Sequence, residues 1–402
     1  QIKVYVPSGV SGGTVQITVA VAAVTSNAKN FNLPTLASSD GTMWRYDLGR
    51  SGNYPNGPTT FPLNLKWSFI PDAIGWIDSS PVIANSTIYL TGVGNDGTGK
   101  NIGKLFALDA NTGSLKWSYV TNNGYNKNGP AVANNIVYVA SSYYIPATTT
   151  YAGKIYALDA NTGALKWSYD ITNEIDASPL VVNGIVYFGV RNGIFYALDA
   201  VNGSLKWSYN CGLGILGSAA FSNNTLYFVG MSSLFALDAS TGALKWKTVA
   251  GPFVYSTPAV YNNTVFVNTG FSISAYDTAN GTLRWKYSVT DGRAGAWGSP
   301  SVANGVVYTS IGDYNIYAID AVSGSLKWVY NTAYQISGYI SPSVSNNTVY
   351  FTHSDLFALD AANGSLKWSY VAPSAYGWYT SPTIANGKIY VTVDSKLNCF
   401  GP

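Results

Sequence analysis

Apolar and polar residues alternate in short stretches along most of this chain. Residues 105–119 read LFALDANTGSLKWSY, with apolar side chains at alternate positions before and after the central Asn-Thr-Gly. A spacing of two predicts β-strands, and Leu115, Trp117 and Tyr119 are expected on one face of the second strand. Asp109 can accept hydrogen bonds from turn N–H groups, and Gly113 tolerates a positive φ. The stretch therefore predicts a tight β-hairpin.

The same hairpin pattern recurs along the chain with a period of roughly 40–50 residues, which is typical of repeat architectures. Its constant positions follow Ala-x-Asp-x-x-x-Gly-x-x-x-Trp, and further copies begin at residues 155, 195, 234, 273, 316 and 356. A Ser-Pro unit followed by an apolar strand precedes each hairpin, as in residues 79–92 and 177–190. One period thus predicts four short antiparallel strands without a helix, which indicates a β-propeller blade.

Both repeated units occur eight times. The tryptophans are residues 67, 117, 167, 207, 246, 285, 328 and 368, and the prolines are residues 81, 130, 179, 258, 300, 342 and 382, with Ala219 in the remaining place. The first Trp has no blade before it, and the last Pro unit has no Trp after it. We therefore expect residues 63–69 to pair with the C-terminal blade, because this closure removes two free sheet edges. The predicted fold is an all-β, eight-bladed propeller of four-stranded antiparallel blades over residues 43–402, with an N-terminal β extension over residues 1–42.

The repeated frame resembles the tryptophan-docking motif of pyrroloquinoline-quinone-type propellers. Met43-Trp44-Arg45-Tyr46-Asp47, with Ser51-Gly52, resembles the stretch that opens many of them. The resemblance covers residues 43–402 and implies the fold. It does not decide the function, because the family contains quinoprotein alcohol dehydrogenases as well as the lipoprotein scaffold of the outer-membrane assembly machine.

The first 42 residues do not fit the repeat. Within them, residues 14–25 read TVQITVAVAAVT, an uncharged run rich in β-branched residues. It is too short for a transmembrane helix and lacks the flanks of a signal peptide, so an extended strand or hairpin is expected. Such a run aggregates if left bare, so it should pack on its own propeller or on an adjacent subunit. The candidate assembly residues are Thr14, Val15, Ile17, Val19 and Val21.

Composition narrows the class of partner. Only 10% of the residues are charged, against about 25% in ordinary globular chains. A net charge of +3 without a basic run suggests neither nucleic acid nor a membrane surface, and no membrane span is predicted. The low charge and the Ser/Thr/Asn/Tyr-rich surface suggest an extracellular or cell-surface protein. Cys211 and Cys399 fall in distant blades, so two separate thiols are expected.

The connections between blades should reach the central channel, where the resembled enzymes hold their quinone. Aromatic residues gather in these connections, and the channel candidates are Trp76, Tyr255, Trp297, Tyr339, Trp378 and Tyr379. They could line a pocket for a sugar or a flat ligand. Alternatively, they could plug the channel, with Lys127 paired to Asp78 and Asp176. Aromatic side chains belong to the core more often than to a site, which favours the plug.

Catalytic chemistry is hard to place on this sequence. His353 is the only His and Glu174 the only Glu, so neither a His-based zinc site nor a Ser-His-Asp arrangement is available. The resembled quinone enzymes use a calcium held by Glu, Asn and Asp, often beside adjacent cysteines, and this chain has no Cys-Cys pair. Glu174 and Asp176 come from one loop. We expect no catalytic residue, metal site or cofactor.

Asn-x-Ser/Thr sequons are numerous. They occur at Asn85, Asn202, Asn223, Asn262, Asn280, Asn346 and Asn363. All are expected in turns on the ring face opposite two inserted loops at residues 92–103 and 141–153. Turns favour Asn and strands favour Thr, so sequons also arise there by chance. Their number and one-sided placement nevertheless favour glycosylation of a secreted protein.

The resulting hypothesis is an extracellular, non-catalytic propeller that serves as a structural cell-surface or filament-forming subunit. It would join copies of itself through the N-terminal β segment by head-to-tail strand exchange, and glycans are possible partners. The alternatives are a quinone-dependent dehydrogenase and a carbohydrate- or protein-binding scaffold.

Overall fold

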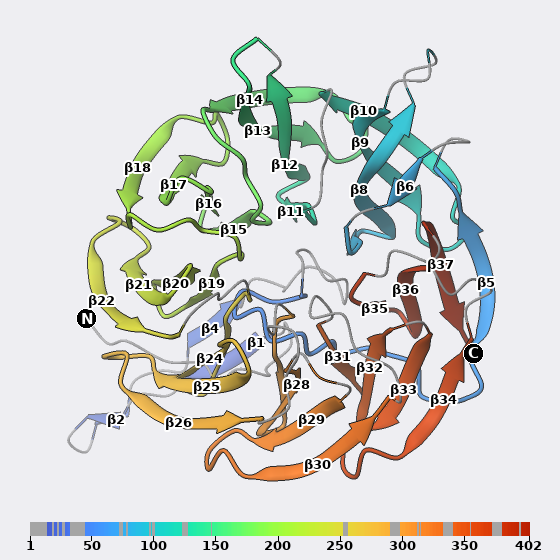
Figure 1. Cartoon of the computed structure of the whole chain (residues 1–402), viewed down its shortest axis with the longest axis vertical. Coiled ribbons are helices and arrows are strands. Elements are labelled where there is room, and N and C mark those ends of the chain that lie inside the picture. The colour runs from blue at the N-terminus through green and yellow to red at the C-terminus, as the bar shows by residue number, and fades with distance from the viewer. Residues whose placement is uncertain are drawn as a thin grey trace.

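The computed structural model describes residues 14–17, 20–21, 24–25, 29–32 and 45–402, apart from 72–74, 78, 96–97, 99–100, 123–127, 146, 252–255, 290–297, 312, 314, 333–340, 354, 372–379 and 394. Eight antiparallel sheets stand around a central axis as the blades of a ring (Figure 1). No helix occurs among the described residues. The predicted eight-bladed, all-β propeller is confirmed.

Each blade has four strands, named A to D from the centre outwards. Blade 1 contains β7 (Val82–Ala84), β8 (Thr87–Asn95), β9 (Asn101–Asp109) and β10 (Leu115–Asn122), and the short β6 (Trp76–Ile77) pairs with the end of β8. Blade 2 contains β11 (Ala131–Ala133), β12 (Ile136–Ile145), β13 (Thr150–Asp159) and β14 (Leu165–Ile171). Blade 3 contains β15 (Leu180–Val182), β16 (Ile185–Gly189), β17 (Ile194–Asp199) and β18 (Leu205–Asn210). Blade 4 contains β19 (Ala220–Ser222), β20 (Thr225–Gly230), β21 (Ser233–Asp238) and β22 (Leu244–Val249).

The second half of the ring repeats this order. Blade 5 contains β23 (Ala259–Tyr261), β24 (Thr264–Asn268), β25 (Ser272–Asp277) and β26 (Leu283–Ser288). Blade 6 contains β27 (Ser301–Ala303), β28 (Val306–Ser310), β29 (Asn315–Asp320) and β30 (Leu326–Asn331). Blade 7 contains β31 (Ser343–Ser345), β32 (Thr348–Thr352), β33 (Leu356–Asp360) and β34 (Leu366–Tyr370). Blade 8 contains β35 (Thr383–Ala385), β36 (Lys388–Val393) and β37 (Lys396–Gly401), with β5 (Asn64–Phe69) as its outermost strand.

Blade 8 is therefore built from both ends of the propeller sequence. β5 pairs antiparallel with β37, and Trp67 lies opposite Cys399 in the register. This is the expected pairing between residues 63–69 and the C-terminal blade. It covers the outer edge of β37, so the last blade has the same four strands as the others.

Six of the eight repeated tryptophans donate a hydrogen bond to the next blade. Trp117 lies opposite Ala107 within its own blade, and its indole N–H donates to the Ala160 carbonyl of blade 2 at 3.1 Å. The ring lies over Gly163, where an added Cβ would come 2.7 Å from Trp117 Cε3. The small residues of the frame thus leave room for an indole between two sheets, as the sequence predicts.

A β-bulge changes one detail of the predicted hairpin. The register between β9 and β10 shifts between Leu115 and Trp117. Leu115 is consequently 50% exposed and does not continue the face of Trp117, as strict alternation had predicted. The bulge recurs at the same place in all eight blades.

A repeated tyrosine in strand B is a second docking group. The Tyr89 hydroxyl donates to the Ala160 carbonyl at 3.0 Å, so it shares this acceptor with Trp117. Tyr138 and Trp167 share the Ala200 carbonyl in the same way. Phe266 takes this place in blade 5, and Trp285 there still donates to the Ala321 carbonyl. The Tyr recurs visibly in the sequence, but the Ala-x-Asp frame alone does not include it.

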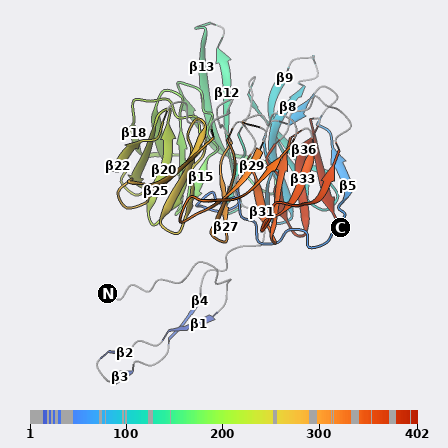
Figure 2. The ribbon, with the colours of Figure 1, turned by 60° about the horizontal axis from the view of Figure 1, so that its bottom comes forward.

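The two inserted segments differ from the expected loops. In blade 1, β8 and β9 extend the hairpin to the pair Asn95–Asn101, and in blade 2, β12 and β13 extend it to Ile145–Thr150. Most of each insertion is thus strand rather than solvated loop, because Gly and Asn can be accommodated in a two-stranded ribbon. The blade 2 hairpin projects from one face of the ring (Figure 2).

The N-terminal β strands form two small sheets of their own. β1 (Thr14–Ile17) pairs antiparallel with β4 (Lys29–Asn32), and β2 (Ala20–Val21) pairs with β3 (Val24–Thr25). Of the candidate assembly residues, Thr14, Val15 and Ile17 lie in β1 and Val21 in β2, whereas Val19 lies outside the described residues. The strands pair within the segment and belong to none of the eight blades.

Candidate functional site: the central channel and the turn face

The stretch from residue 45 to residue 57, here called the lead-in, crosses the inner strands of five blades. Figure 1 shows this blue segment passing across the middle of the ring. Its carbonyl groups accept backbone N–H groups from blades 4 to 8 in turn. These bonds are Phe221 to Leu48 at 2.7 Å, Val260 to Gly49 at 2.8 Å, Val302 to Ser51 at 2.7 Å, Val344 to Gly52 at 2.9 Å and Gly387 to Asn56 at 2.8 Å. The lead-in therefore ties the inner strands of these blades together.

Two buried arginines hold the lead-in in the channel. Arg50 donates through Nε to the Ala219 carbonyl at 3.1 Å and through Nη2 to the Pro179 carbonyl at 3.0 Å. Arg45 donates through Nη1 to the Ser299 carbonyl at 3.1 Å and through Nη2 to the Pro300 carbonyl. Each guanidinium thus pairs with main-chain oxygens at the start of the inner strands, where a buried unpaired carbonyl would be costly.

In other blades, side-chain hydroxyl groups donate to the equivalent carbonyl groups. The Ser343 hydroxyl donates to the Pro382 carbonyl at 2.5 Å, and the Thr383 hydroxyl donates to the Pro81 carbonyl at 2.7 Å. Ser301 donates to the Pro342 carbonyl. Blades 2 and 3 have Ala131 and Leu180 after the proline, so they cannot donate to the Pro179 and Ala219 carbonyls of the blade that follows each of them. Arg50 supplies the missing donors there.

The Ser of the Ser-Pro unit also has a defined role. From blade 3 to blade 8, the backbone N–H of this residue donates to the hydroxyl of the equivalent residue in the next blade, which forms a chain of hydrogen bonds along that part of the channel. The bonds are Ser178 to Ser218 at 2.8 Å, Ser218 to Thr257 at 2.9 Å, Thr257 to Ser299 at 2.9 Å, Ser299 to Ser341 at 2.8 Å and Ser341 to Ser381 at 3.3 Å.

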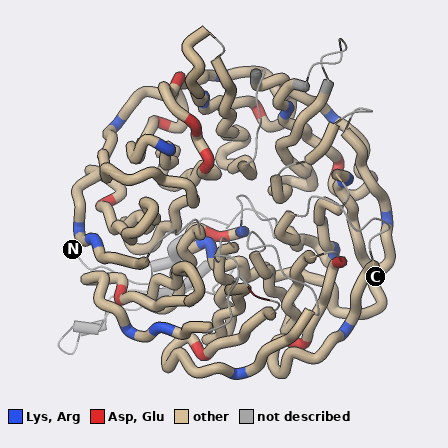
Figure 3. The backbone as a smooth tube through the Cα atoms, in the orientation of Figure 1, with Lys and Arg blue, Asp and Glu red and all other residues tan. Residues whose placement is uncertain are grey.

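The electrostatics of the channel follow from burial. Burial lowers the pKa of Arg45 to about 10 and that of Arg50 to about 9, while neighbouring Asp47 partly opposes both shifts. Both arginines therefore remain charged at neutral pH. Burial raises the pKa of Asp47, against the effect of the hydrogen bond that its Oδ1 accepts from the Ser51 N–H at 2.8 Å. Charged positions accordingly form a group near the centre of the ring in addition to those around its edge (Figure 3).

The predicted channel aromatics fall mostly outside the described residues. This applies to Tyr255, Trp297, Tyr339, Trp378 and Tyr379. Trp76 is described: it lies in β6, opposite Val93 of β8, and is half-buried. The aromatic pocket and the aromatic plug therefore both stay predictions. The lead-in with Arg45 and Arg50 fills part of the channel and was not predicted.

The acidic residues of the loop before blade 3 have a partner that the sequence did not suggest. Arg191 binds Glu174 Oε2 through Nη1 at 2.6 Å and Asp176 Oδ2 through Nη2 at 2.7 Å. Asp176 thus pairs with Arg191, whereas the expected partner Lys127 and the second acid Asp78 lie outside the described residues. Arg191 comes from the next hairpin of the same blade, and a carboxylate bound to a guanidinium has fewer lone pairs left for a cation.

The remaining candidates are a metal site, the two cysteines and the single histidine. Within the described ranges, no group of three His, Cys, Asp or Glu side chains could hold a metal ion. Cys211 and Cys399 are separate thiols, and burial raises the pKa of Cys399 to about 12. His353 lies in the connection between β32 and β33, where its backbone N–H donates to the Asp355 carbonyl at 2.8 Å.

All seven sequons lie at exposed turns, in two structural classes. Asn85, Asn223, Asn262 and Asn346 open the turns between strands A and B, with left-handed φ values of +44° to +49°. Asn202, Asn280 and Asn363 lie in the turns between strands C and D, where their Oδ1 atoms accept the N–H of the residue two positions on at 2.9–3.0 Å.

The sequon residues also serve the fold. In the first class, the Thr hydroxyl accepts a hydrogen bond from a cation of strand D, as Thr225 does from Lys245 Nζ at 2.7 Å. The side chain of Asn346 is partly covered, because its Nδ2 donates to the Gly57 carbonyl of the lead-in at 2.7 Å. Turn geometry therefore accounts for Asn and Thr at these positions, and glycosylation stays a prediction.

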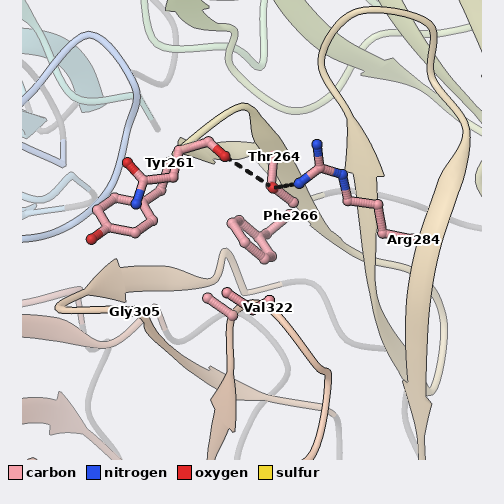
Figure 4. Close-up of a pocket in the computed structure, with 8 residues that line it drawn as sticks. Tyr261, Thr264, Phe266, Arg284, Gly305 and Val322 are labelled. Carbon is pink, nitrogen blue, oxygen red and sulfur yellow. Dashed lines mark hydrogen bonds between the residues drawn. The ribbon is translucent and has the colours of Figure 1, made fainter.

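A shallow recess opens on the same face between blades 5 and 6. Phe266 lies at its base, and Arg284 is held at its side by a 2.7 Å hydrogen bond to the Thr264 hydroxyl and a 2.6 Å ion pair with Asp277 (Figure 4). Val322 and Gly305 of blade 6 line the opposite side. The recess occurs where Phe266 replaces the docking tyrosine. Its apolar base and single, already paired cation provide little to orient a ligand.

The docking geometry and the ring closure define a propeller of the tryptophan-docking class. The family described as outer membrane protein assembly factor BamB matches residues 127–218, 210–293 and 270–396, which is more than half of the chain. The chain belongs to this family of pyrroloquinoline-quinone-type repeats. No sequence among curated proteins matches it.

Solved structures share the architecture at low sequence identity. BamB from Moraxella catarrhalis aligns with a TM-score of 0.66 at 18% identity, over 85% of this chain and 98% of that one. Quinohemoprotein alcohol dehydrogenase ADHIIG from Pseudomonas putida HK5 aligns with a TM-score of 0.73 at 17% identity, over 90% and 80% of the two chains. The computationally designed Ika8 protein aligns with a TM-score of 0.63 at 14% identity, over 83% and 99%. At these identities the likeness establishes the fold alone. No helix in the described part of the chain is long and apolar enough to cross a membrane.

Proposed function

We propose that this protein is a non-catalytic, extracellular propeller that serves as a structural cell-surface or filament-forming subunit. Copies join through the N-terminal β segment, and the partner of the chain is another copy of itself. The observation that carries this proposal is the separation of the N-terminal strands from the ring. β5 closes the propeller without them, and they form sheets of only two strands.

Two-stranded sheets are marginal on their own in water and gain stability when another strand is added. Among the described residues β1 pairs with β4 alone, so no described strand lies on its other edge. A head-to-tail contact between such a segment and a different surface of the next copy does not close on itself, so it produces a filament.

The lead-in supports a non-catalytic ring. Arg45, Arg50 and Tyr54 are buried in the channel, and the arginines donate to the main chain of the blades. The chain's own side chains thus occupy part of the channel. The low charged fraction and the exposed sequons support an extracellular location.

Deletion of residues 1–42 tests the proposal. The truncated protein should remain a folded monomer, as measured by circular dichroism and light scattering. The full chain should form filaments that are visible by electron microscopy. A matched point variant, Ile17→Lys in β1, should also prevent assembly, whereas Val201→Lys at an exposed turn should not. Assembly of the truncated protein, or a full-length protein that stays monomeric, would refute the proposal.

A quinone-dependent dehydrogenase is the second candidate, because quinohemoprotein dehydrogenases share the fold over most of this chain. A quinone absorbance band in protein purified from its native source, together with dye-linked alcohol oxidation, would favour it. A stable monomer with affinity for a glycan or an unrelated protein would favour a binding scaffold instead.

A further inference from the structure

We propose that the projecting β12–β13 hairpin of blade 2 is the surface that receives β1 of the next copy. This inference rests on the proposed assembly through the N-terminal segment and names the acceptor for it. The projecting part, here called the finger, comprises residues 142–153. Its strands pair from Ser142–Gly153 to Ile145–Thr150.

The finger extends beyond the sheet that would protect it. On one side, β11 pairs with β12 only as far as Tyr138. On the other side, β14 pairs with β13 only from Gly153 onwards. Within the described residues, Tyr143–Ile145 and Thr150–Ala152 therefore have no strand on their outer edges. Each edge is about as long as the four-residue β1.

The finger lacks the features that discourage strand addition. Residues 142–153 read SYYIPATTTYAG and contain no charged side chain. Tyr144 and Tyr151 pack against each other with ring centroids 5.1 Å apart, yet remain 46% and 48% exposed. Exposed tyrosines that already pack on one another provide contact area at little entropic cost. The corresponding part of the blade 1 hairpin is different, because Asp96 and Lys100 give it charge.

The outer strands of the blades are protected by comparison. Each strand D carries a cation next to the bulge: Lys66, Lys116, Lys166, Lys206, Lys245, Arg284, Lys327 and Lys367. Charges and bulges on an edge strand disfavour pairing with another sheet. The ring perimeter is thus a poor acceptor, although it presents eight outer edges.

Strand β1, which would add to the finger, also carries no charge. β1 reads TVQI, whereas β4 on the other side of its sheet carries Lys29. The free edge of β1 is therefore the unprotected edge of the N-terminal sheet. Figure 2 shows the N-terminal strands on one side of the ring and the finger on the opposite side. Donor and acceptor on opposite faces allow each copy to contact one neighbour above and one below.

The test introduces the charge that the finger lacks. The variant Tyr144→Lys/Tyr151→Lys should fold as a monomer and lose filament formation in light scattering and electron microscopy. Phe271→Lys is the matched control, since Phe271 is 44% exposed in a turn between strands B and C of blade 5. This control should assemble as the wild type does. If the tyrosine variant also assembles normally, the finger is not the acceptor.

A cross-linking experiment covers the case in which the lysine variant misfolds. In a Cys211→Ser background, Gln16→Cys and Tyr151→Cys should give a ladder of disulfide-linked oligomers on oxidation of the filaments, and each single variant should give none. Absence of the ladder from intact filaments would overturn the inference. If deletion of residues 1–42 abolishes assembly but the finger variant assembles normally, only the claim that the finger is the acceptor is refuted. Assembly of the deletion variant refutes the proposed function as well.

Discussion

Two glycines of blade 3 allow the contribution of tryptophan docking to be measured. Gly203 and Gly184 have almost the same left-handed backbone, with φ values of +74° and +73°. A Cβ at Gly203 would lie 2.6 Å from Trp167 Cε3, whereas a Cβ at Gly184 would meet nothing within 4 Å. Gly184→Ala therefore changes the backbone energy alone, and Gly203→Ala adds the displacement of the indole.

The expected free-energy changes follow from these contacts. An L-residue in the left-handed region costs roughly 1–2 kcal/mol, which is the expected loss for Gly184→Ala. Gly203→Ala adds about 1–3 kcal/mol of overpacking and about 1 kcal/mol for the hydrogen bond from Trp167 to the Ala200 carbonyl. The total for Gly203→Ala is about 3–6 kcal/mol. With an unfolding entropy of about 2 cal/mol/K per residue, each kcal/mol lowers the Tm of this 402-residue chain by about 1 °C.

Thermal unfolding followed by calorimetry measures both variants. Gly203→Ala should lower the Tm about three times as much as Gly184→Ala. Trp167→Leu in the same chain removes the obstructing ring, so the additional loss from Gly203→Ala should then shrink toward that of Gly184→Ala. Equal shifts for the two glycines, or no coupling to Trp167, would refute the view that the indole occupies this space in solution.

Three further outcomes are expected. Arg50→Met should lower stability by roughly 2–5 kcal/mol in denaturant titration, because it leaves the buried Ala219 and Pro179 carbonyls without donors; equal stability would contradict the role assigned to Arg50. The hydrogen bond from Lys206 is the largest cause that lowers the pKa of Asp199, and the Val201 N–H is the next. The stabilisation by this carboxylate should therefore be present above about pH 4 and be lost as the pH falls further. Asp199→Asn should flatten that part of the Tm–pH curve. Mass spectrometry of native protein should find glycan at Asn202 more readily than at Asn346, whose amide is bonded to the lead-in.

The repeated features of the fold could be predicted from the sequence. Eight Trp and eight Pro positions with mismatched ends led directly to the ring and to the pairing of β5 with β37. The docking tyrosines also repeat and could have been found, because Tyr89 and its equivalents stand at one place in strand B. The roles of Arg45 and Arg50 could not be found in this way. The lead-in occurs once, and its arginines bond to main-chain carbonyls, which leave no pattern in the sequence.

The extended hairpins were missed for a different reason. Gly, Asn and Thr in residues 92–103 and 141–153 are typical of loops, yet each ribbon begins from strands already paired in the blade. Tertiary support overrides local propensity there. The partner of Asp176 was missed because Arg191 lies 15 positions away on a hairpin whose register the sequence does not give.

The path of the lead-in has a mechanical consequence. A pulling force applied to the segment before Arg45 enters the ring at its centre rather than at its rim. Arg45 is bonded to the start of blade 6, and the carbonyl groups that follow it are bonded to blades 4 to 8. The load is thus divided among several blades close to the axis and exerts little torque on the disc. Strand β5, which closes the ring at its outer edge, lies beyond these anchors along the chain and is shielded from the tension.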